Sequence, residues 1–502
     1  MFIKKIAGIA AAACIAANAY ALPPNAVLDI PVINLSGASA QDEGIEALFG
    51  TLCLPGTLDI YRDNGANPGS AYRAFSCQLD SAQVSTPPLT NPNIMVRKRS
   101  AGGSGQGVNP LTDNLPGGPV KTIDFMIVSA ANCVTNGPGE WLCSATGAGL
   151  QQAKPTAGVS DVDPGMFRGV NTPANTLPVN PAVLSGLTIK PAAALVFGIP
   201  VTLGLRNALQ EVQINAGLVP VGCIGSETID CMPSLTSAEV ASIMSGQISS
   251  WSKFIVPNSG GSLVPFTSAV ATPPGSPLVA ICRRVDGSGT QATTNANFLD
   301  NPCTSSAPTP VNASVFGGPT VVLNSGSGNV ENCLEDFNDG TNTAGGNPAS
   351  RTFWAVGVQS LEKNADLAFN YRFVKIDGVA PILENVYNGS YKDWSEQSFQ
   401  WRAPGQPDVP NTNQLAILNT LSTLAGSPAT LGSIDAAQFT HSFGVSGFLA
   451  LTRLGNSLAA NAVFNPLLPI TPYTHAPSGS SLDNCRTPVI DRTISQFPSF
   501  GF

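Results

Sequence analysis

The sequence predicts an α/β fold, because apolar runs typical of strands alternate along the chain with apolar runs of helical spacing. The strand-like runs include Ile123–Val128, Leu195–Leu205, Leu278–Cys282 and Thr352–Gln359. The helical stretches include Thr236–Ser245, Gly289–Leu299, Asn329–Phe337 and Asn413–Leu424. This alternation favours a mostly parallel sheet in each domain.

The composition is typical of a folded chain with little charge. The 502 residues are 43% hydrophobic, which is enough for about two or three domains. Only 11% are charged, against about 25% in an average soluble domain. The net charge of −8 argues against nucleic acid or an anionic membrane surface as a partner. Two histidines leave little room for a zinc site or a histidine-based triad, so we expect no metal, no cofactor and no catalytic residue.

Residues 1–21 are expected to be a signal peptide. Lys4 and Lys5 form a basic region, Ile6–Ala17 is apolar, and Ala19–Ala21 fits a small-x-small cleavage site. No later apolar run approaches the roughly 18 residues of a spanning helix. We therefore expect a Sec-exported bacterial protein, periplasmic or extracellular, that does not span the membrane. In the alternative interpretation, Ala11–Cys14 is a lipobox and its cysteine is lipidated.

The cysteines predict disulfides. Removal of residues 1–21 would take away Cys14 and leave ten of the eleven cysteines, and an even number in an exported chain predicts five bridges. Pairing of nearest neighbours gives Cys53–Cys77, Cys133–Cys143, Cys223–Cys231, Cys282–Cys303 and Cys333–Cys485. Spacing alone leaves this connectivity open.

Two stretches rich in Pro, Gly, Ser and Asn, residues 85–120 and 300–350, are expected to be surface loops or insertions. The composition shifts again at Ala403–Pro407, after which helical apolar patterns dominate.

The segment Arg283–Thr290 carries the clearest chemistry. It reads Arg-Arg-Val-Asp-Gly-Ser-Gly-Thr and stands between a strand-like and a helix-like run. Ser288 can cap the helix, whose first free N–H groups then face the loop. The glycines at 287 and 289 let the backbone approach a ligand closely.

Arg284 adds a planar fork of donors that matches a tetrahedral oxyanion. We expect Asp286, two residues further on, to hold this guanidinium in place. Together these residues predict an anion site. The alternative is an ordinary capped helix beside a solvated arginine pair.

The same segment resembles the phosphate-contacting loop of the periplasmic phosphate-binding proteins of ABC importers, including the DING-type proteins. Other motifs stand in the order of that family. Leu235–Trp251 resembles its helix that ends in Gly-x-Ile-x-x-Trp, and Trp354–Leu361 resembles its Ile-Gly-Tyr strand. Val374–Pro381, followed by Asn388–Tyr391, resembles its return crossing.

The resemblance implies a two-lobed periplasmic binding protein (Venus-flytrap) fold, type II-like, with loop insertions and an added C-terminal helical region. Lobe I is expected to combine residues 22–198 with 385–502, and lobe II to span residues 199–384. Ligands of α/β sheets bind beyond the carboxyl ends of the strands, so the site should lie in the cleft between the lobes.

The resemblance also implies the ligand-binding residues. From lobe II they are Arg284, Ser288, Gly289 and Thr290, supported by Asp286; from lobe I they are Ser39, Ala40, Ser104 and Asp161. Ala40 replaces an aromatic residue that contributes a backbone N–H in the family. The family's counterpart of Asp161 accepts the proton of phosphate, which disfavours sulfate because sulfate has no proton to give. The alternative for Ser39 is an ordinary turn residue, and the alternative for Asp161 is a cap of the turn before Pro164. Ser104 stands in a glycine-rich loop, so the alternative there is a shifted alignment with the family's loop.

The implied function is capture of inorganic phosphate, or arsenate, by a monomeric binding protein that is not an enzyme and that supplies an ABC permease. The chain is long for this family, and its extra segments could cover the face on which a permease docks. The alternative is therefore a secreted or surface protein of the same fold that acts in adhesion or phosphate sequestration without a permease. A phosphatase is disfavoured, because His441 and His475 lie far along the chain from the anion loop.

Overall fold

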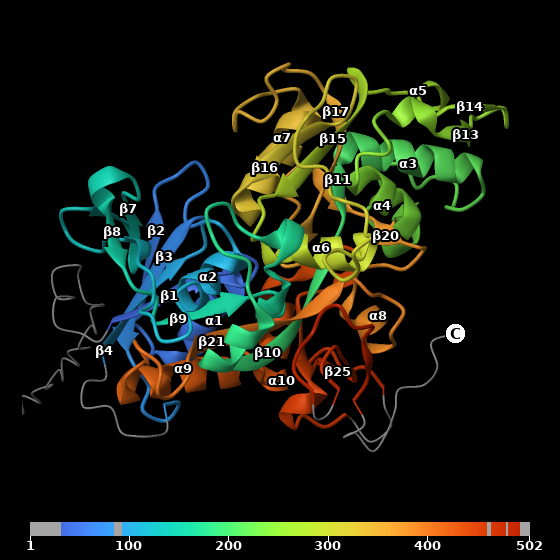
Figure 1. Ribbon diagram of the computed structural model, residues 1–502. Helices are drawn as coiled ribbons and strands as arrows, with labels where there is room; N and C mark the ends of the chain where they lie inside the picture. Colours follow the sequence, from blue (N-terminus) through green and yellow to red (C-terminus); the bar gives the residue numbers. More distant parts are fainter. Residues whose placement is uncertain (1–31, 85–92, 459–462, 478–479, 492–502) are drawn as a thin grey trace, which may run out of the picture.

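Two β-sheets organise the residues that the computed structural model describes, which are 32–84, 93–458, 463–477 and 480–491 (Figure 1). The expected signal peptide and the alternative lipobox at Cys14 lie outside these residues. Within the described part, no helix is long and apolar enough to cross a membrane.

The first sheet has twelve strands and is mixed. Its order is β25 (Ile470–Thr471), β24 (Phe448–Leu451), β10 (Leu187–Gly198), β21 (Trp394–Arg402), β9 (Ala157–Ser160), β1 (Val32–Gly37), β4 (Asn93–Arg99), β3 (Tyr72–Gln78), β2 (Asp59–Asp63), β7 (Glu140–Cys143) and β6 (Cys133–Gly137), with β18 (Gln359–Ser360) paired to β10. Strand β1 is parallel to both β4 and β9, whereas β21 is antiparallel to both β10 and β9.

The second sheet has five strands. Its order is β16 (Thr320–Asn324), β15 (Ser276–Arg284), β17 (Phe353–Gly357), β11 (Pro200–Thr202) and β19 (Tyr371–Phe373). The first three strands are parallel, and β11 is antiparallel to both of its neighbours. Two-stranded ribbons complete the β structure: β5 (Ile123–Met126) with β8 (Leu150–Ala153), β12 (Ser234–Leu235) with β20 (Lys375–Ile376), β13 (Ile255–Pro257) with β14 (Leu263–Pro265), β22 (Thr440–His441) with β23 (Gly444–Val445), and β26 (Tyr473–Thr474) with β27 (Val489–Ile490).

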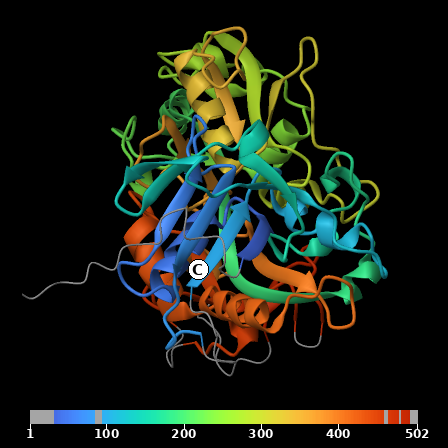
Figure 2. The same ribbon diagram turned by 90° about the vertical axis from the view of Figure 1, so that its left-hand side faces the viewer.

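The helices divide between the two sheets. The helices that accompany the first sheet are α1 (Asp42–Leu52), α2 (Asn109–Thr112), α9 (Thr412–Leu424) and α10 (Pro428–Gln438). Those that accompany the second are α3 (Leu203–Asn215), α4 (Ser237–Met244), α5 (Phe266–Ala269), α6 (Gly289–Leu299), α7 (Ser327–Asp339) and α8 (Leu383–Tyr387). We call each sheet with its helices a lobe, the first and the second. Figures 1 and 2 show the green and yellow second lobe above the blue first lobe, with the orange helices α9 and α10 beneath it.

The α/β class and the two-lobed architecture are therefore confirmed. The chain passes from the first sheet to the second between Gly198 and Pro200. It pairs briefly with the first sheet at β18 and returns to it with β21, which begins at Trp394. The expectation of a mostly parallel sheet is wrong for the first lobe. The reason is that β10, β21 and β24 come from distant parts of the chain and enter the sheet in opposite directions, which local helix–strand alternation does not reveal.

Several predicted elements agree with the structure, and two do not. The stretch from Gly289 to Leu299 is the helix α6, and Thr236 caps α4 through a capping box with Glu239. The run 195–205 is not one strand, because it holds the end of β10, the short strand β11 and the first turn of α3. The stretch 85–120 is not all loop, because β4 lies within it and buries Ile94, Met95 and Val96.

The region after residue 403 contains α9 and α10 and then short strands. The helices were expected, but the strands were not. Residues 300–350 likewise contain β16 and α7 in addition to loops.

The described residues form five disulfides. The pairs Cys53–Cys77, Cys133–Cys143 and Cys223–Cys231 are confirmed. The other two predicted pairs are wrong, since the structure joins Cys282 to Cys333 and Cys303 to Cys485. Parallel β15 and the helix α7 that packs on it bring Cys282 and Cys333 together, although 51 residues separate them.

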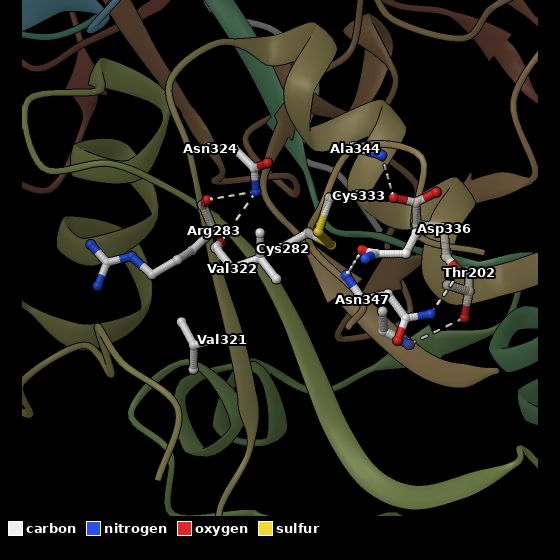
Figure 3. The surroundings of a disulfide bond; sticks show 12 residues. Thr202, Cys282, Arg283, Val321, Val322, Asn324, Cys333, Asp336, Ala344 and Asn347 are labelled. Carbon is white, nitrogen blue, oxygen red and sulfur yellow. Dashed lines mark hydrogen bonds between the residues drawn. A yellow bond between two sulfur atoms is a disulfide. The ribbon is translucent and has the colours of Figure 1, made fainter. Parts of the chain in front are cut away.

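Figure 3 shows the Cys282–Cys333 bridge within the second lobe. Cys282 precedes the two arginines at the end of β15, and Cys333 lies in the second turn of α7. The side-chain amide of Asn324, drawn in the same view, donates to the carbonyl oxygens of Arg283 (3.0 Å) and Val322 (3.2 Å). The bridge therefore fixes the arginine-bearing strand relative to α7.

Candidate functional site

The anion loop joins β15 to α6. The Ser288 hydroxyl accepts a hydrogen bond from the Gln291 backbone N–H over 3.3 Å, so the predicted cap of α6 is confirmed. Gly287 has a φ of +91°, a conformation that other residues rarely adopt. A Cβ atom on Gly289 would lie 2.3 Å from the Ser104 hydroxyl oxygen, so only glycine lets the start of α6 approach the first lobe this closely.

Arg284 is buried where β15 ends. Its Nε donates to the Asn324 carbonyl (3.2 Å), Nη2 to the Ser325 carbonyl (3.0 Å) and Nη1 to the Ser327 hydroxyl (3.3 Å). These bonds hold the guanidinium plane and leave one N–H on each terminal nitrogen for another acceptor. Burial lowers the pKa of Arg284 to about 10, with Asp161 and Asp42 acting in the opposite direction, so the group is charged at neutral pH.

The expectation for Asp286 is corrected by the structure. Its carboxylate accepts a bond from Nη2 of Arg283 at 2.8 Å, so it holds the first arginine of the pair and not Arg284. The reason is that consecutive residues of a strand point to opposite faces, and Arg283 lies on the face from which the loop turns back. Backbone carbonyls of 324 and 325 take the role that was predicted for Asp286.

In the first lobe, the loop between β1 and α1 forms one part of the candidate site. The Ser39 hydroxyl lies 3.1 Å from the Ser327 hydroxyl at the start of α7. Ala40 is fully buried in the same loop. The buried ammonium of Lys98 donates to the carbonyls of Gly37 (3.1 Å) and Ala38 (2.8 Å), which fixes the loop from behind.

Ser104 and Asp161 come from two other loops of the first lobe and contact each other. The Ser104 hydroxyl donates to Oδ2 of Asp161 over 3.2 Å and accepts from the Asp161 backbone N–H over 3.1 Å. The Gln41 amide donates to Oδ1 of the same carboxylate over 3.2 Å. The neighbouring Asp163, rather than Asp161, caps the turn at Pro164, so the cap that was the alternative role of Asp161 belongs to Asp163.

Burial raises the pKa of Asp161 to about 6, although hydrogen bonds from Gln41 and Ser104 and the charge of Arg284 act in the opposite direction. At pH 7 the carboxylate is therefore ionised but holds a proton more readily than an exposed aspartate. It is suited to accept a hydrogen bond from a partly protonated anion.

The loops of the two lobes meet at this place. The Gly105 backbone N–H in the first lobe donates to the Gly287 carbonyl in the second over 2.7 Å. The polar side chains expected at the site are all at most 3% exposed: Ser39, Ser104, Asp161, Arg284, Ser288 and Thr290. The structure thus brings together the predicted residues of both lobes except Asp286, which lies beside them.

Buried polar atoms of this cluster lack hydrogen-bond partners within the described part of the chain, Oε1 of Gln41 among them. Among the described residues, the hydroxyl of Thr290 is buried without a hydrogen bond. Burial of an unpaired hydroxyl costs free energy of folding unless a ligand or a water molecule forms a hydrogen bond with it. Thr290 lies in the first turn of α6, where the backbone N–H groups also lack intrahelical partners.

Ser327, Gln41 and Lys98 contact the cluster but were not predicted from the sequence. Ser327 belongs to no motif, and only the packing of α7 on β15 places it beside Arg284. Gln41 follows directly on the predicted Ala40, so an extension of that loop by one residue would have included it. Lys98 stands between Arg97 and Arg99 at the end of β4, so no signal in the sequence distinguishes it from these two neighbours.

The described residues show no group of three His, Cys, Asp or Glu side chains arranged to hold a metal ion. The two histidines take structural positions. His475 Nδ1 lies 2.5 Å from the buried carboxylate of Glu396, and His441 Nε2 lies 2.5 Å from the carbonyl oxygen of Leu361.

No protein-family model matches the chain, and no curated protein matches its sequence. Solved structures that resemble it include three of low identity. A protein of Clostridium perfringens, assigned as a phosphate ABC transporter substrate-binding protein and solved with bound phosphate, is 14% identical with a TM-score of 0.40; the match covers 81% of this chain and 98% of that one. An ABC-type phosphate transport receptor of Vibrio cholerae is 10% identical with a TM-score of 0.35, over 78% and 93% of the two chains. PstS of Borrelia burgdorferi is 10% identical with a TM-score of 0.32, over 81% and 97%.

Likenesses of this degree do not decide what the chain binds.

Proposed function

We propose that this protein binds inorganic phosphate between its two lobes and is not an enzyme. The observation that carries the proposal is the convergence of Arg284 and Thr290 from the second lobe with Ser39, Ser104 and Asp161 from the first. These groups are buried, and they combine a cation, hydroxyl donors and a single anionic acceptor. The resemblance of the Arg283–Thr290 segment to a phosphate-contacting loop supports the same ligand.

The donors supply the attraction for the anion. Arg284 retains one free N–H on each terminal nitrogen, which suits two oxygens of a tetrahedral anion. The N-terminus of α6 adds backbone N–H groups and the positive end of a helix dipole. The unpaired Thr290 hydroxyl would gain a hydrogen bond when an anion binds. The hydroxyls of Ser39 and Ser104 would approach from the other lobe.

In this proposal, Asp161 is the residue that discriminates phosphate from sulfate. A carboxylate is a poor neighbour for sulfate, because two anions would face each other without a proton between them. Monohydrogen or dihydrogen phosphate carries a proton that it can donate to Asp161. The carboxylate therefore favours phosphate and arsenate over sulfate, as the resemblance implies.

The cellular role follows from export, which remains a prediction. A monomer released into the periplasm or the medium would hold phosphate between closed lobes and deliver it to an ABC permease. Sequestration or adhesion without a permease is the alternative, and no contact within the described residues favours it.

Calorimetric titration of the purified mature protein with phosphate, arsenate and sulfate tests the proposal. We expect saturable binding of one phosphate, similar binding of arsenate and much weaker binding of sulfate. Arg351→Ala is a matched control for Arg284→Ala, because Arg351 is exposed and carries the same charge away from the site. Absence of phosphate and arsenate binding in the millimolar range would contradict the proposal and favour the adhesion role.

A further inference from the structure

A cavity of about 290 Å³ adjoins the candidate anion site between the two lobes. Ser39 from the first lobe and Ser327 from the second both line it, and their hydroxyl oxygens are 3.1 Å apart. The Ser327 hydroxyl also accepts the bond from Arg284. The anion site and the cavity therefore share a wall that consists of two serine hydroxyls.

Where the start of α6 meets the loop of Ser104, the anion site is closed by tight contacts between the lobes. Gly105 and Gly287 are joined by the hydrogen bond between the lobes. A Cβ atom on Gly103 would lie 2.9 Å from the Cα of Ser288, and one on Gly289 would lie 2.3 Å from the Ser104 hydroxyl. These contacts leave no room on that side for a group attached to the bound anion. The pair Ser39 and Ser327 is the side on which such a group has space.

The cations of the cavity are already engaged by carboxylates. Arg62 pairs with Glu46 and Glu140, Arg73 pairs with Glu43 and Glu46, and Lys363 pairs with Glu43. Four carboxylates line the cavity: Asp42, Glu43, Glu331 and Asp366. A second anionic group would find no free cation here and would face these carboxylates.

Neutral polar groups in the lining have unused hydrogen-bonding capacity. The side-chain amide of Asn67 and the hydroxyl of Ser70, both half-buried, line the cavity, and no other side chain or backbone group of the described residues bonds to them. The fully apolar side chains of the lining are only Pro68, Ala368 and Phe369. The lining therefore suits a neutral hydroxylated group better than an apolar or an anionic one.

We infer that the site also accepts phosphate monoesters whose substituent is small, neutral and hydroxylated. The ester oxygen passes between Ser39 and Ser327, whose mutual hydrogen bond is exchanged for bonds to the ligand, and the substituent occupies the cavity beside Asn67 and Ser70. The volume of about 290 Å³ is close to the lower end of ordinary ligand pockets, so a substituent of the size of glycerol fits. This inference rests on the proposed phosphate site and adds the class of its ligands.

Calorimetric titration with phosphate, glycerol phosphate, phenyl phosphate and pyrophosphate tests the inference. We expect glycerol phosphate to bind within about tenfold of phosphate, and the apolar and the doubly anionic ligands to bind at least about tenfold more weakly than glycerol phosphate. Phosphorus NMR of the eluted ligand has to show the intact ester, which excludes hydrolysis as the source of binding.

Two variants locate the substituent. Ala368→Trp fills the cavity from an exposed position in the second lobe, and Asn67→Trp fills it from a half-buried position in the first. Each should weaken glycerol phosphate at least about tenfold while phosphate binding stays within about twofold of wild type. Ala436→Trp, at an exposed position on α10, is the matched control and should change neither.

The outcomes separate this inference from the proposed function. Binding of phosphate without glycerol phosphate overturns the inference and leaves the phosphate site standing. Unchanged glycerol phosphate binding in both cavity variants also overturns it, because the substituent would then lie elsewhere. Failure of the wild-type protein to bind either ligand overturns both.

Discussion

The hydroxyl of Ser104 donates to the carboxylate of Asp161 over 3.2 Å and accepts the Asp161 backbone N–H over 3.1 Å. These two hydrogen bonds fix the Asp161 carboxylate beside the start of α6. A Cβ atom on Gly289 would lie 2.3 Å from the Ser104 hydroxyl oxygen and 2.8 Å from Cβ of Asp161. One acceptor is thus held in a defined place within a cluster of donors. In the proposed phosphate site, this acceptor would distinguish a protonated anion from a fully deprotonated one.

Asp161→Asn should change selectivity more than affinity. The amide keeps the shape of the side chain but removes the negative charge that repels sulfate and accepts the phosphate proton. We expect the preference for phosphate over sulfate to fall by at least about tenfold, with a smaller loss in phosphate affinity. Competition titrations with both anions measure this ratio, and an unchanged ratio would show that Asp161 does not face the ligand.

Asp161 should also make the stability of the ligand-free protein depend on pH. Burial raises its pKa from 3.8 to about 6, so between these values the folded protein holds a proton that the unfolded chain has lost. Its contribution to the free energy of unfolding therefore decreases as the pH rises from about 4 to 6, by about 2–3 kcal/mol, and levels off above.

Urea unfolding of the wild type and Asp161→Asn at several pH values isolates this contribution. Other buried carboxyls, such as Asp163 and Glu362, also have raised pKa values and act in both proteins alike. The difference in unfolding free energy, wild type minus variant, should fall between pH 4 and 6. A difference that is constant over this range would contradict the burial of an ionisable Asp161.

Arg284→Ala should weaken phosphate binding by at least about 100-fold, because hydrogen bonds to charged groups contribute about 1.5–3 kcal/mol each. Arg284→Lys keeps the charge but loses the planar fork, so its affinity should lie between those of the wild type and the alanine variant. Thermal unfolding confirms that each variant is folded. An alanine variant that is folded and binds phosphate like the wild type would remove Arg284 from the site.

The Cys303–Cys485 disulfide should slow phosphate exchange. Cys303 follows α6 in the second lobe, and Asn484 beside Cys485 accepts a bond from the Asp163 backbone N–H in the first lobe over 2.6 Å. The bridge therefore ties the C-terminal end of α6 in the second lobe to the first lobe. Opening of the lobes has to stretch or reorganise this connection.

Serine substitution of both cysteines should speed phosphate release several-fold in a stopped-flow trapping experiment. The matched control is the double serine variant of Cys223 and Cys231, a bridge within the second lobe only. Equal release rates in the two double variants would show that the Cys303–Cys485 bridge does not restrict the lobes.

Local chemistry explains which parts of the molecule the sequence could predict. The cap at Ser288 and the extent of α6 depend on a strand, a glycine turn and a helix that are contiguous in the chain. The loops with Ser39, Ser104 and Asp161 could be found only by resemblance to a family motif, and the structure places all three beside Arg284. Whether they bind phosphate remains a prediction.

The features that were missed depend on contacts between distant residues. Strand β4 lies between segments rich in Gly, Pro and Ser, and its pairing with β1 and β3 decides its structure. The choice between Cys303 and Cys333 as the partner of Cys282 depends on the packing of α7. The partner of Asp286 is decided by the face of β15 from which each arginine projects.

Anomalous diffraction at the arsenic edge, from crystals of the protein grown with arsenate, tests the central claim most directly. The account predicts an arsenic peak within hydrogen-bond distance of Arg284, Thr290 and Asp161, and its loss when phosphate is added in excess. A map in which this position is empty while arsenic binds elsewhere on the surface would contradict the account.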